Sequence, residues 1–160
     1  MRLLPDWSLN NLVTQLQALK GVALIVAVTV VAEIGDFSRF TNPRQAMAYL
    51  GLIPGEHSSG SRTRPAGITK VGNKEVRRML YEAAWAYRNN AKVGSWMLTH
   101  RPEKVTQVSK DIAWKAQQRL CWRYRSLVAK GKKSQIAVTA VARELVGFMW
   151  DIACTTRIPV

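Results

Sequence analysis

Residues 50–88 read LGLIPGEHSSGSRTRPAGITKVGNKEVRRMLYEAAWAYR, and the rest of the chain is arranged around this stretch. Its centre, residues 54–67, is rich in Gly, Pro, Ser and Arg, a composition that predicts a loop without regular structure. An apolar segment precedes the loop, and Gly72-Asn73 opens a basic amphipathic helix directly after it. A loop that carries hydroxyl groups, lies between rigid elements and is surrounded by cations is suited to contact a phosphate.

Apolar residues at helical spacing predict three helices before this loop, over about residues 9–19, 22–34 and 43–50. We expect Ser8 to cap the first helix, Gly35 to end the second, and Pro43 to lie in the first turn of the third. The segment 22–34 is apolar on nearly every face, which predicts a helix in the middle of the core.

After the loop we expect helices over about residues 74–89, 109–130 and 135–153, capped by Asn73, Ser109 and Ser134. Residues 90–104 read as an irregular, partly helical connection, and no clear strand pattern is found. The predicted fold class is therefore all-α, a compact multi-helix domain with a helix–hairpin–helix-like N-terminal part. Residues 9–51 form the helical hairpin region, 52–72 the serine loop and 73–153 a helical bundle.

The charge of the chain indicates its class of partner. The 24 Lys and Arg residues exceed the 10 Asp and Glu residues, so that the net charge is +14. A pI near 10.5 at this size favours a polyanion such as nucleic acid, and an anionic membrane surface is the alternative. The apolar run 22–32 is shorter than the roughly 20 residues that a membrane span needs, so we expect no membrane partner and interpret the run as a buried helix.

The sulfur and imidazole groups give no sign of a metal site or a disulfide framework. Cys121 and Cys154 are far apart in sequence, and His57 and His100 are isolated from them and from each other. Such spacing lacks the pattern of zinc ligands, and it fits a protein of the reducing cytoplasm.

Cations cluster around the serine loop and along two predicted helices. Lys115, Arg119 and Arg123 are four residues apart and repel one another on one helix face, unless an anion lies over them. Phosphate backbone is the favoured anion, and a solvated face is the alternative. The candidate nucleic-acid-binding residues are Arg62, Arg64, Lys70, Lys74, Arg77, Arg78, Lys115, Arg119 and Arg123.

Two further features have both a packing and a binding interpretation. The link Gly21-Val22-Ala23 between the first two helices has one of the two glycines of a phosphate-binding hairpin, so a plain packing turn is favoured. Tryptophans 85, 114, 122 and 150 all lie in predicted helices, and we expect them in the core rather than as platforms for base stacking.

No set of carboxylates suits phosphoryl transfer by two metal ions. Glu33 and Asp36 are close in sequence but flank a predicted helix end, where capping and surface charge explain them better. What remains is a serine among cations, with Arg62, Arg64, Lys70 and Arg77 near enough in sequence to hold a phosphate beside it. Serine is a poor nucleophile unless a base or a metal activates it.

Several motifs recur here in a specific order. They are VAEIGD at 31–36 with Arg39-Phe40, AYLGLIP at 48–54, Ser59-Gly60, ITKVGN at 68–73 with Arg77-Arg78 and Leu80, IAWKAQ at 112–117 with Arg119-Leu120, and ARELVGF at 142–148. Over about residues 15–155 the chain resembles the C-terminal, serine-bearing domain of transposases of the IS-one-ten / IS-one-sixteen family of bacterial insertion sequences.

The resemblance implies a DNA recombinase in which Ser59, the serine before a glycine, attacks a DNA phosphodiester and forms a covalent serine–DNA link. It further implies a structured guide RNA, assembly into homo-oligomers, and Mg²⁺ held by four acidic residues of an N-terminal RuvC-like domain. We expect that domain to be absent from this chain, and the chain alone, a truncated transposase or an expressed fragment, to bind nucleic acid without turnover. The alternative is a non-catalytic nucleic-acid-binding helical module in which Ser59 is only a loop residue.

Overall fold

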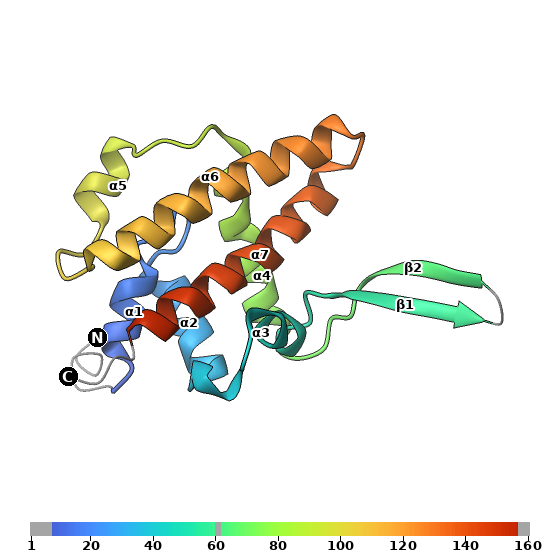
Figure 1. Cartoon of the computed structure of the whole chain (residues 1–160), viewed down its shortest axis with the longest axis horizontal. Coiled ribbons are helices and arrows are strands. Elements are labelled where there is room, and N and C mark those ends of the chain that lie inside the picture. The colour runs from blue at the N-terminus through green and yellow to red at the C-terminus, as the bar shows by residue number, and fades with distance from the viewer. Residues whose placement is uncertain (1–7, 60–61, 157–160) are drawn as a thin grey trace.

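The computed structural model describes residues 8–59 and 62–156, and between residues 56 and 66 it describes backbone alone. In that part of the chain, helices pack around a common core and a two-stranded hairpin projects from them (Figure 1). Because 68% of the structure is helical and its one sheet has two strands, the expectation of an all-α domain is confirmed.

The described chain contains seven α-helices. They are α1 (Asn10–Leu16), α2 (Leu24–Ile34), α3 (Pro43–Tyr49), α4 (Lys74–Ala84), α5 (Ser95–His100), α6 (Gln107–Ala129) and α7 (Ser134–Thr155). Two short 3-10 helices, η1 (Phe37–Arg39) and η2 (Trp85–Arg88), follow α2 and α4, and the hairpin consists of β1 (Pro54–Ser59) and β2 (Arg62–Ile68).

Helix α7 lies at the centre of the core. It contacts α1, α3, α4 and α6, and Ala142, Leu145 and Met149 on it are fully buried. The long helix α6 runs antiparallel to α7 along one side (Figure 1). A Cβ atom on Gly147 would lie 2.9 Å from Met47 Cε, so the missing side chain lets α3 pack closely against α7.

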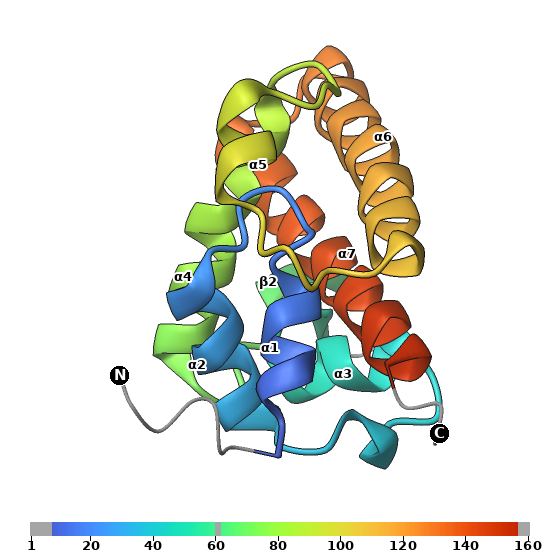
Figure 2. The same cartoon turned by 90° about the vertical axis from the view of Figure 1, so that its left-hand side faces the viewer.

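The prediction that residues 22–34 form the central helix was wrong. Helix α2 lies at the edge of the domain, on the side opposite α6 (Figure 2), and contacts α1 and α4. Only Ala27, Val30, Val31 and Ile34 are buried in it, whereas Ile25 is 65% exposed. Apolar residues on every face permit a central position but do not require it, since the long helices α6 and α7 bury more of the core between them.

The helix ends confirm some of the expected caps. The Asn73 side chain accepts hydrogen bonds from the backbone nitrogens of Glu75 and Val76, at 2.9 and 3.3 Å, and so caps α4. Pro43 occupies the first turn of α3 behind the cap Asn42, and Gly35 ends α2 with a positive φ of 71°.

Other expected caps were wrong. Helix α1 begins after Leu9 without a side-chain cap, so Ser8 does not cap it, and Ser134 is the first residue of α7 rather than its cap. The cap of α6 is Thr106, whose hydroxyl accepts from the backbone nitrogen of Ser109 at 3.2 Å. Ser109 itself is buried within the first turn, since the helix starts two residues earlier than the sequence pattern indicated.

Two buried polar side chains join distant parts of the chain. The amide of Gln15 donates to the Lys104 carbonyl and accepts from the Thr106 nitrogen, both at 2.9 Å, which ties α1 to the start of α6. The hydroxyl of Tyr87, fully buried, donates to the Lys20 carbonyl at 2.6 Å and ties η2 to the turn after α1.

Candidate nucleic-acid interface

The serine-bearing segment is a β-hairpin, so the prediction of an irregular loop over residues 54–67 was wrong. Strands β1 and β2 pair antiparallel, with Ser59 opposite Arg62 and His57 opposite Arg64. The register leaves Gly60-Ser61 between the strands, and these two residues lie outside the described part of the chain. A Gly-Ser pair between two short runs is a known hairpin signal, and it could have indicated this structure from sequence.

The base of the hairpin is fixed to the helical body by backbone contacts. The nitrogens of Lys70 and Thr69 donate to the carbonyls of Gly51 and Ile53, each at 3.0 Å. Gly51 and Gly72 adopt positive φ angles of 74° and 79°, and a Cβ atom on Gly72 would lie 2.7 Å from the Tyr49 carbonyl oxygen. These two glycines therefore allow the chain before the hairpin to pass very close to the chain after it.

Arg77 adds a side-chain clamp at the same place. Its Nη1 donates to the Leu50 carbonyl at 3.3 Å and to the Val71 carbonyl. Lys70 adopts the left-handed conformation, with φ of 59°, which is uncommon for a residue with a side chain. The clamp holds the end of α3 and the segment after β2 together, so the hairpin leaves the body in one direction (Figure 1).

The backbone of Ser59 lies at the outer end of this projection. It is five residues from Pro54 at the base, about 17 Å at the rise of a strand. The side chains of Ser59, Arg62 and Arg64 lie outside the described part of the structure, and the pairing of their backbones is what the structure describes. Ser59 and Arg62 are thus directly opposite each other next to the turn.

Lys70 and Arg77 do not surround Ser59, contrary to the prediction. With Lys74 and Arg78 they line a hollow of about 300 Å³ at the base of the hairpin, against α4 and α7. The sequence placed these cations close to the serine, but an extended strand moves the serine away from them. The geometry separates Ser59 at the tip of the hairpin from a group of cations at its base.

Two of the cations at the base have partners within the chain. Arg77 is held by backbone carbonyls, as described above. Arg78 pairs with Glu75 and Glu82 on the exposed side of α4, at 3.0 and 3.1 Å. The hydrogen bond and the charge of Glu75, with those of Glu82, raise the pKa of Arg78 above its ordinary value. Within the described residues Lys70 and Lys74 form no ion pair.

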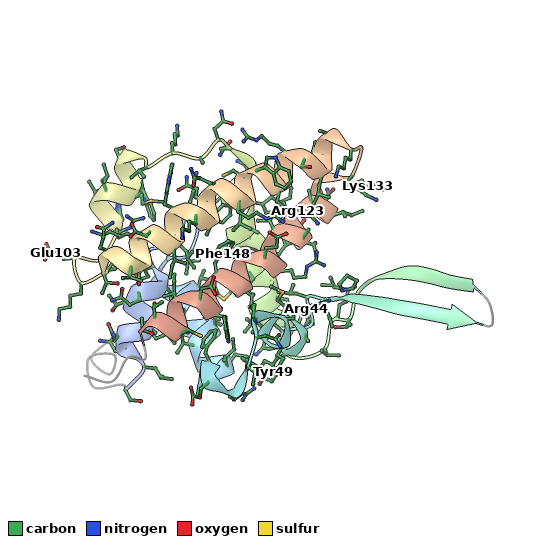
Figure 3. All side chains as sticks on the ribbon, in the orientation of Figure 1. Arg44, Tyr49, Glu103, Arg123, Lys133 and Phe148 are labelled. Atoms are coloured by element: carbon green, nitrogen blue, oxygen red, sulfur yellow. The ribbon has the colours of Figure 1, made fainter. Side chains whose placement is uncertain are left out.

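A second hollow, of about 490 Å³, opens on the other side of Lys70. Ile68, Leu127 and Ile136 contribute its apolar wall, and Lys70, Arg123 and Arg143 contribute its cations. Sequence reasoning missed Arg143 as a site residue. It is the single cation in α7, and that isolation was the available signal. Figure 3 labels Arg123 on the hairpin side of the molecule and Glu103 at the opposite end.

The basic row on α6 is partly neutralised from within the chain. Arg119 donates from Nε and Nη2 to the two carboxylate oxygens of Glu144 on α7, at 3.0 and 3.2 Å. Arg123 Nε lies 3.2 Å from Glu144 Oε1 in an ion pair. The anion that the spacing required is thus Glu144 for these two residues. Lys115 is exposed and forms no ion pair with the described residues.

The four tryptophans that were expected in the core divide into two pairs. Trp85 and Trp150 pack against the core as expected, and Trp150 Nε1 donates to the Phe40 carbonyl at 3.2 Å. For Trp114 and Trp122 the prediction of a buried position was wrong, since they are 39% and 51% exposed on α6.

The link between α1 and α2 packs inside the domain. Gly21 has a positive φ of 82°, and a Cβ atom there would lie 2.5 Å from the Ala83 carbonyl oxygen of α4. This close approach explains why a glycine stands at this position, and it favours the packing-turn interpretation over phosphate binding.

The acidic residues near α2 serve local structure. Asp36 accepts from the Ser38 nitrogen at 2.9 Å and caps η1, and Glu33 accepts from Asn73 Nδ2 at 3.1 Å. Among the side chains that the structure describes, in residues 8–55 and 67–156, no three of His, Cys, Asp or Glu come together as a metal-binding group. Among the helices described there, none combines the length and the apolar character needed to cross a bilayer.

Comparison with known proteins gives one consistent result. The family model described as Transposase IS116/IS110/IS902 family matches residues 13–98, more than half of the chain. A Sinorhizobium fredii protein named as a transposase is 55% identical over 153 residues, 96% of this chain and 39% of the relative. The transposase for insertion sequence element IS1111A of Coxiella burnetii is 37% identical over 78 residues, 49% of this chain and 21% of the relative. The chain therefore spans about two fifths of the first relative and about one fifth of the second.

Proposed function

Because this chain belongs to the IS116/IS110/IS902 transposase family, we propose that it is a DNA-binding domain that contributes Ser59 as the nucleophile for strand cleavage and exchange. The observation that carries the proposal is the position of Ser59 at the outer end of a hairpin anchored at its base. A phosphodiester can reach such a position without displacing any part of the helical core.

In the proposed chemical step, one phosphoester bond forms as another breaks. The hydroxyl oxygen of Ser59 attacks phosphorus, and the bond from phosphorus to the departing strand oxygen breaks as the new serine–phosphorus ester forms. The serine proton passes to a base, and the departing oxygen takes up a proton. Because the phosphorus stays esterified, now to the serine, the hydroxyl oxygen of another strand can attack this phosphorus, release the serine and complete the exchange.

The cations at the base of the hairpin have a positioning role in this proposal. Lys70, Lys74 and Arg143 carry charges that no described acidic side chain neutralises, and they line the two hollows beside the strands. Phosphates on either side of the reacting one would bind there and align the DNA along the hairpin. Arg62 and Arg64, the cations of β2, are proposed to contact the reacting phosphate region itself.

The described residues do not provide a ligand set for magnesium. We therefore propose that the metal binds to an acidic RuvC-like part of the complete transposase, where it would stabilise charge on the phosphate. A structured guide RNA, assembly with copies of the same protein and action in the cytoplasm belong to the same proposal. Co-purification of RNA and the mass of the complex in light scattering test the first two.

The test replaces the matching segment of the Sinorhizobium fredii relative with this chain, since the two are 55% identical over 153 residues. Radiolabelled element-end DNA and magnesium are added, and protein–DNA adducts are resolved on a denaturing gel. Ser59→Ala should abolish the adduct and retain DNA binding, whereas the neighbouring change Ser58→Ala should retain both.

An adduct that survives Ser59→Ala would instead support the alternative, a binding module without a catalytic serine. Separately, the isolated chain is expected to bind DNA and to leave it intact. Robust strand cleavage by the isolated chain would contradict the proposal that cleavage also needs the metal-binding part of the transposase.

A further inference from the structure

The solvent-facing side of α6 displays two tryptophans. Trp122 is 51% exposed and Trp114 is 39% exposed, although tryptophan is usually well buried. The buried residues of α6 include Ala116, Leu120 and Cys121, and at 3.6 residues per turn Trp122 points almost directly away from that stripe. Its indole therefore extends into solvent and does not close a gap in the core.

The surroundings of these indoles are basic. Helix α6 contains five cations, Lys110, Lys115, Arg119, Arg123 and Arg125, and its single acidic residue is Asp111. Asp111 accepts a hydrogen bond from Gln107 at 2.8 Å, at the start of the helix and about three turns before Trp122. Between Trp114 and the end of the helix, α6 contributes no carboxylate. Glu144 of α7 pairs with Arg119 and Arg123, whereas Lys115 and Arg125 form no ion pair with the described residues.

Arg119 holds Trp122 in place. The two hydrogen bonds to Glu144 fix its guanidinium, and the guanidinium carbon lies 5.1 Å from the centre of the Trp122 ring. This is the distance of a cation–π contact. Glu144, Arg119 and Trp122 form a chain of contacts from α7 to the surface, so one face of the indole is supported while half of the side chain stays exposed.

We infer that this face of α6 is a binding site for a single-stranded segment of nucleic acid, with unpaired bases stacked on Trp122 and Trp114. Aromatic side chains set among cations favour this ligand, because the rings contact bases and the cations contact phosphates. The indoles are about 12 Å apart along the helix, so they would contact different bases of one strand. A duplex fits less well, because its bases are already stacked on one another and are not free to lie on the rings.

This site shares with the proposed function only the binding of nucleic acid, and it requires no chemistry at Ser59. The two proposals can therefore fail separately. Ser59→Ala should leave single-strand affinity unchanged, whereas loss of an indole should leave the serine in place for adduct formation.

The experiment measures fluorescence anisotropy with three labelled probes of equal length: an oligothymidylate, the same strand with abasic residues, and a duplex. Trp122→Ala is expected to weaken binding of the oligothymidylate roughly tenfold, and Trp114→Ala by a similar factor or less. Neither change should alter the affinity for the abasic strand. Trp122→Phe should recover part of the lost affinity, because a phenyl ring still offers a face for stacking.

The matched control is Trp96→Ala. Trp96 is 61% exposed on α5, where its ring stacks on His100 at 4.5 Å, and it is outside the basic face of α6. Equal losses for Trp122→Ala and Trp96→Ala would overturn the inference, as would an equal loss on the abasic strand. Loss of self-association in sedimentation with unchanged oligothymidylate affinity would also overturn it, and would assign the face to a second copy of the chain.

Discussion

Arg119 and Glu144 form a bidentate ion pair between the two longest helices, α6 and α7, with Nε–Oε2 and Nη2–Oε1 distances of 3.0 and 3.2 Å. The pair neutralises part of a basic row for which the sequence favoured a phosphate ligand, with a solvated face as the alternative. Because Arg123 shares the same carboxylate, one acidic residue in α7 controls the charge of two cations in α6. We therefore expect stability and the proposed binding of nucleic acid to be coupled at this position.

Glu144→Gln should lower the free energy of unfolding by about 1 kcal/mol, because two guanidiniums lose their counter-charge and repel each other. The same change should strengthen duplex DNA binding at low salt, since both guanidiniums become free. Urea denaturation and anisotropy measure the two effects. Glu82→Gln is the control, since Glu82 pairs with Arg78 where both side chains are more than half exposed. Equal effects of the two substitutions would contradict the coupling.

Gly51→Ala should destabilise the protein by about 1–3 kcal/mol, because the new methyl group would meet the backbone of Val71 at a positive φ. Gly35→Ala provides the comparison, since Gly35 has a similar φ of 71° and nothing within 4 Å of a Cβ atom. Its effect should be limited to backbone strain of about 1 kcal/mol. Urea midpoints of the two variants test this, and a Gly51 variant as stable as the Gly35 variant would show that the hairpin base can relax.

Tyr87→Phe should lower stability by about 1–2 kcal/mol near neutral pH, since it leaves the Lys20 carbonyl without its buried donor. Burial, and then the charge of Cys121, raise the pKa of Tyr87 far above its ordinary value. The unfolded chain loses this proton from about pH 10, whereas the folded chain keeps it, so folding stability falls as the pH rises further.

The variant lacks that titration. The difference in free energy of unfolding between the natural protein and Tyr87→Phe should therefore shrink above about pH 10. Urea denaturation at a series of alkaline pH values measures the difference. A gap that stays constant across the series would mean that the Tyr87 phenol ionises equally in both states.

Lys70→Gln and Arg143→Gln should each weaken duplex DNA binding and reduce the dependence of log affinity on log salt by about 0.9, the effect of one lost phosphate contact. Lys104→Gln is the control, because Lys104 is exposed next to Glu103, at the end of the molecule opposite the hairpin (Figure 3). Salt slopes from anisotropy titrations decide the result. If all three variants shift the slope alike, binding is spread over the whole surface rather than gathered at the hairpin base.

The helical class, six of the main helices and the cap Asn73 were predictable because they depend on neighbours within one or two turns. Asn73 needs only the free amides of Glu75 and Val76, which any helix starting there presents. The hairpin was not predicted, because Pro, Gly and Ser weaken the strand pattern and the pairing is stabilised only once both strands leave a fixed base.

In the candidate site, too, some features were predictable from the sequence and others were not. Composition predicts a polyanion as the partner, and the ordered motifs between residues 31 and 148 indicated the family, since charge and local motifs are properties of the residues themselves. The partners of each cation depend on which helices meet. In the folded chain Ser59 lies about 17 Å from the base of the hairpin at Pro54, and Arg119 is paired with Glu144. Trp122, which was expected in the core, is half exposed. The pairing of Arg119 with Glu144 follows from a contact between residues distant in sequence, and a local pattern carries no information about it.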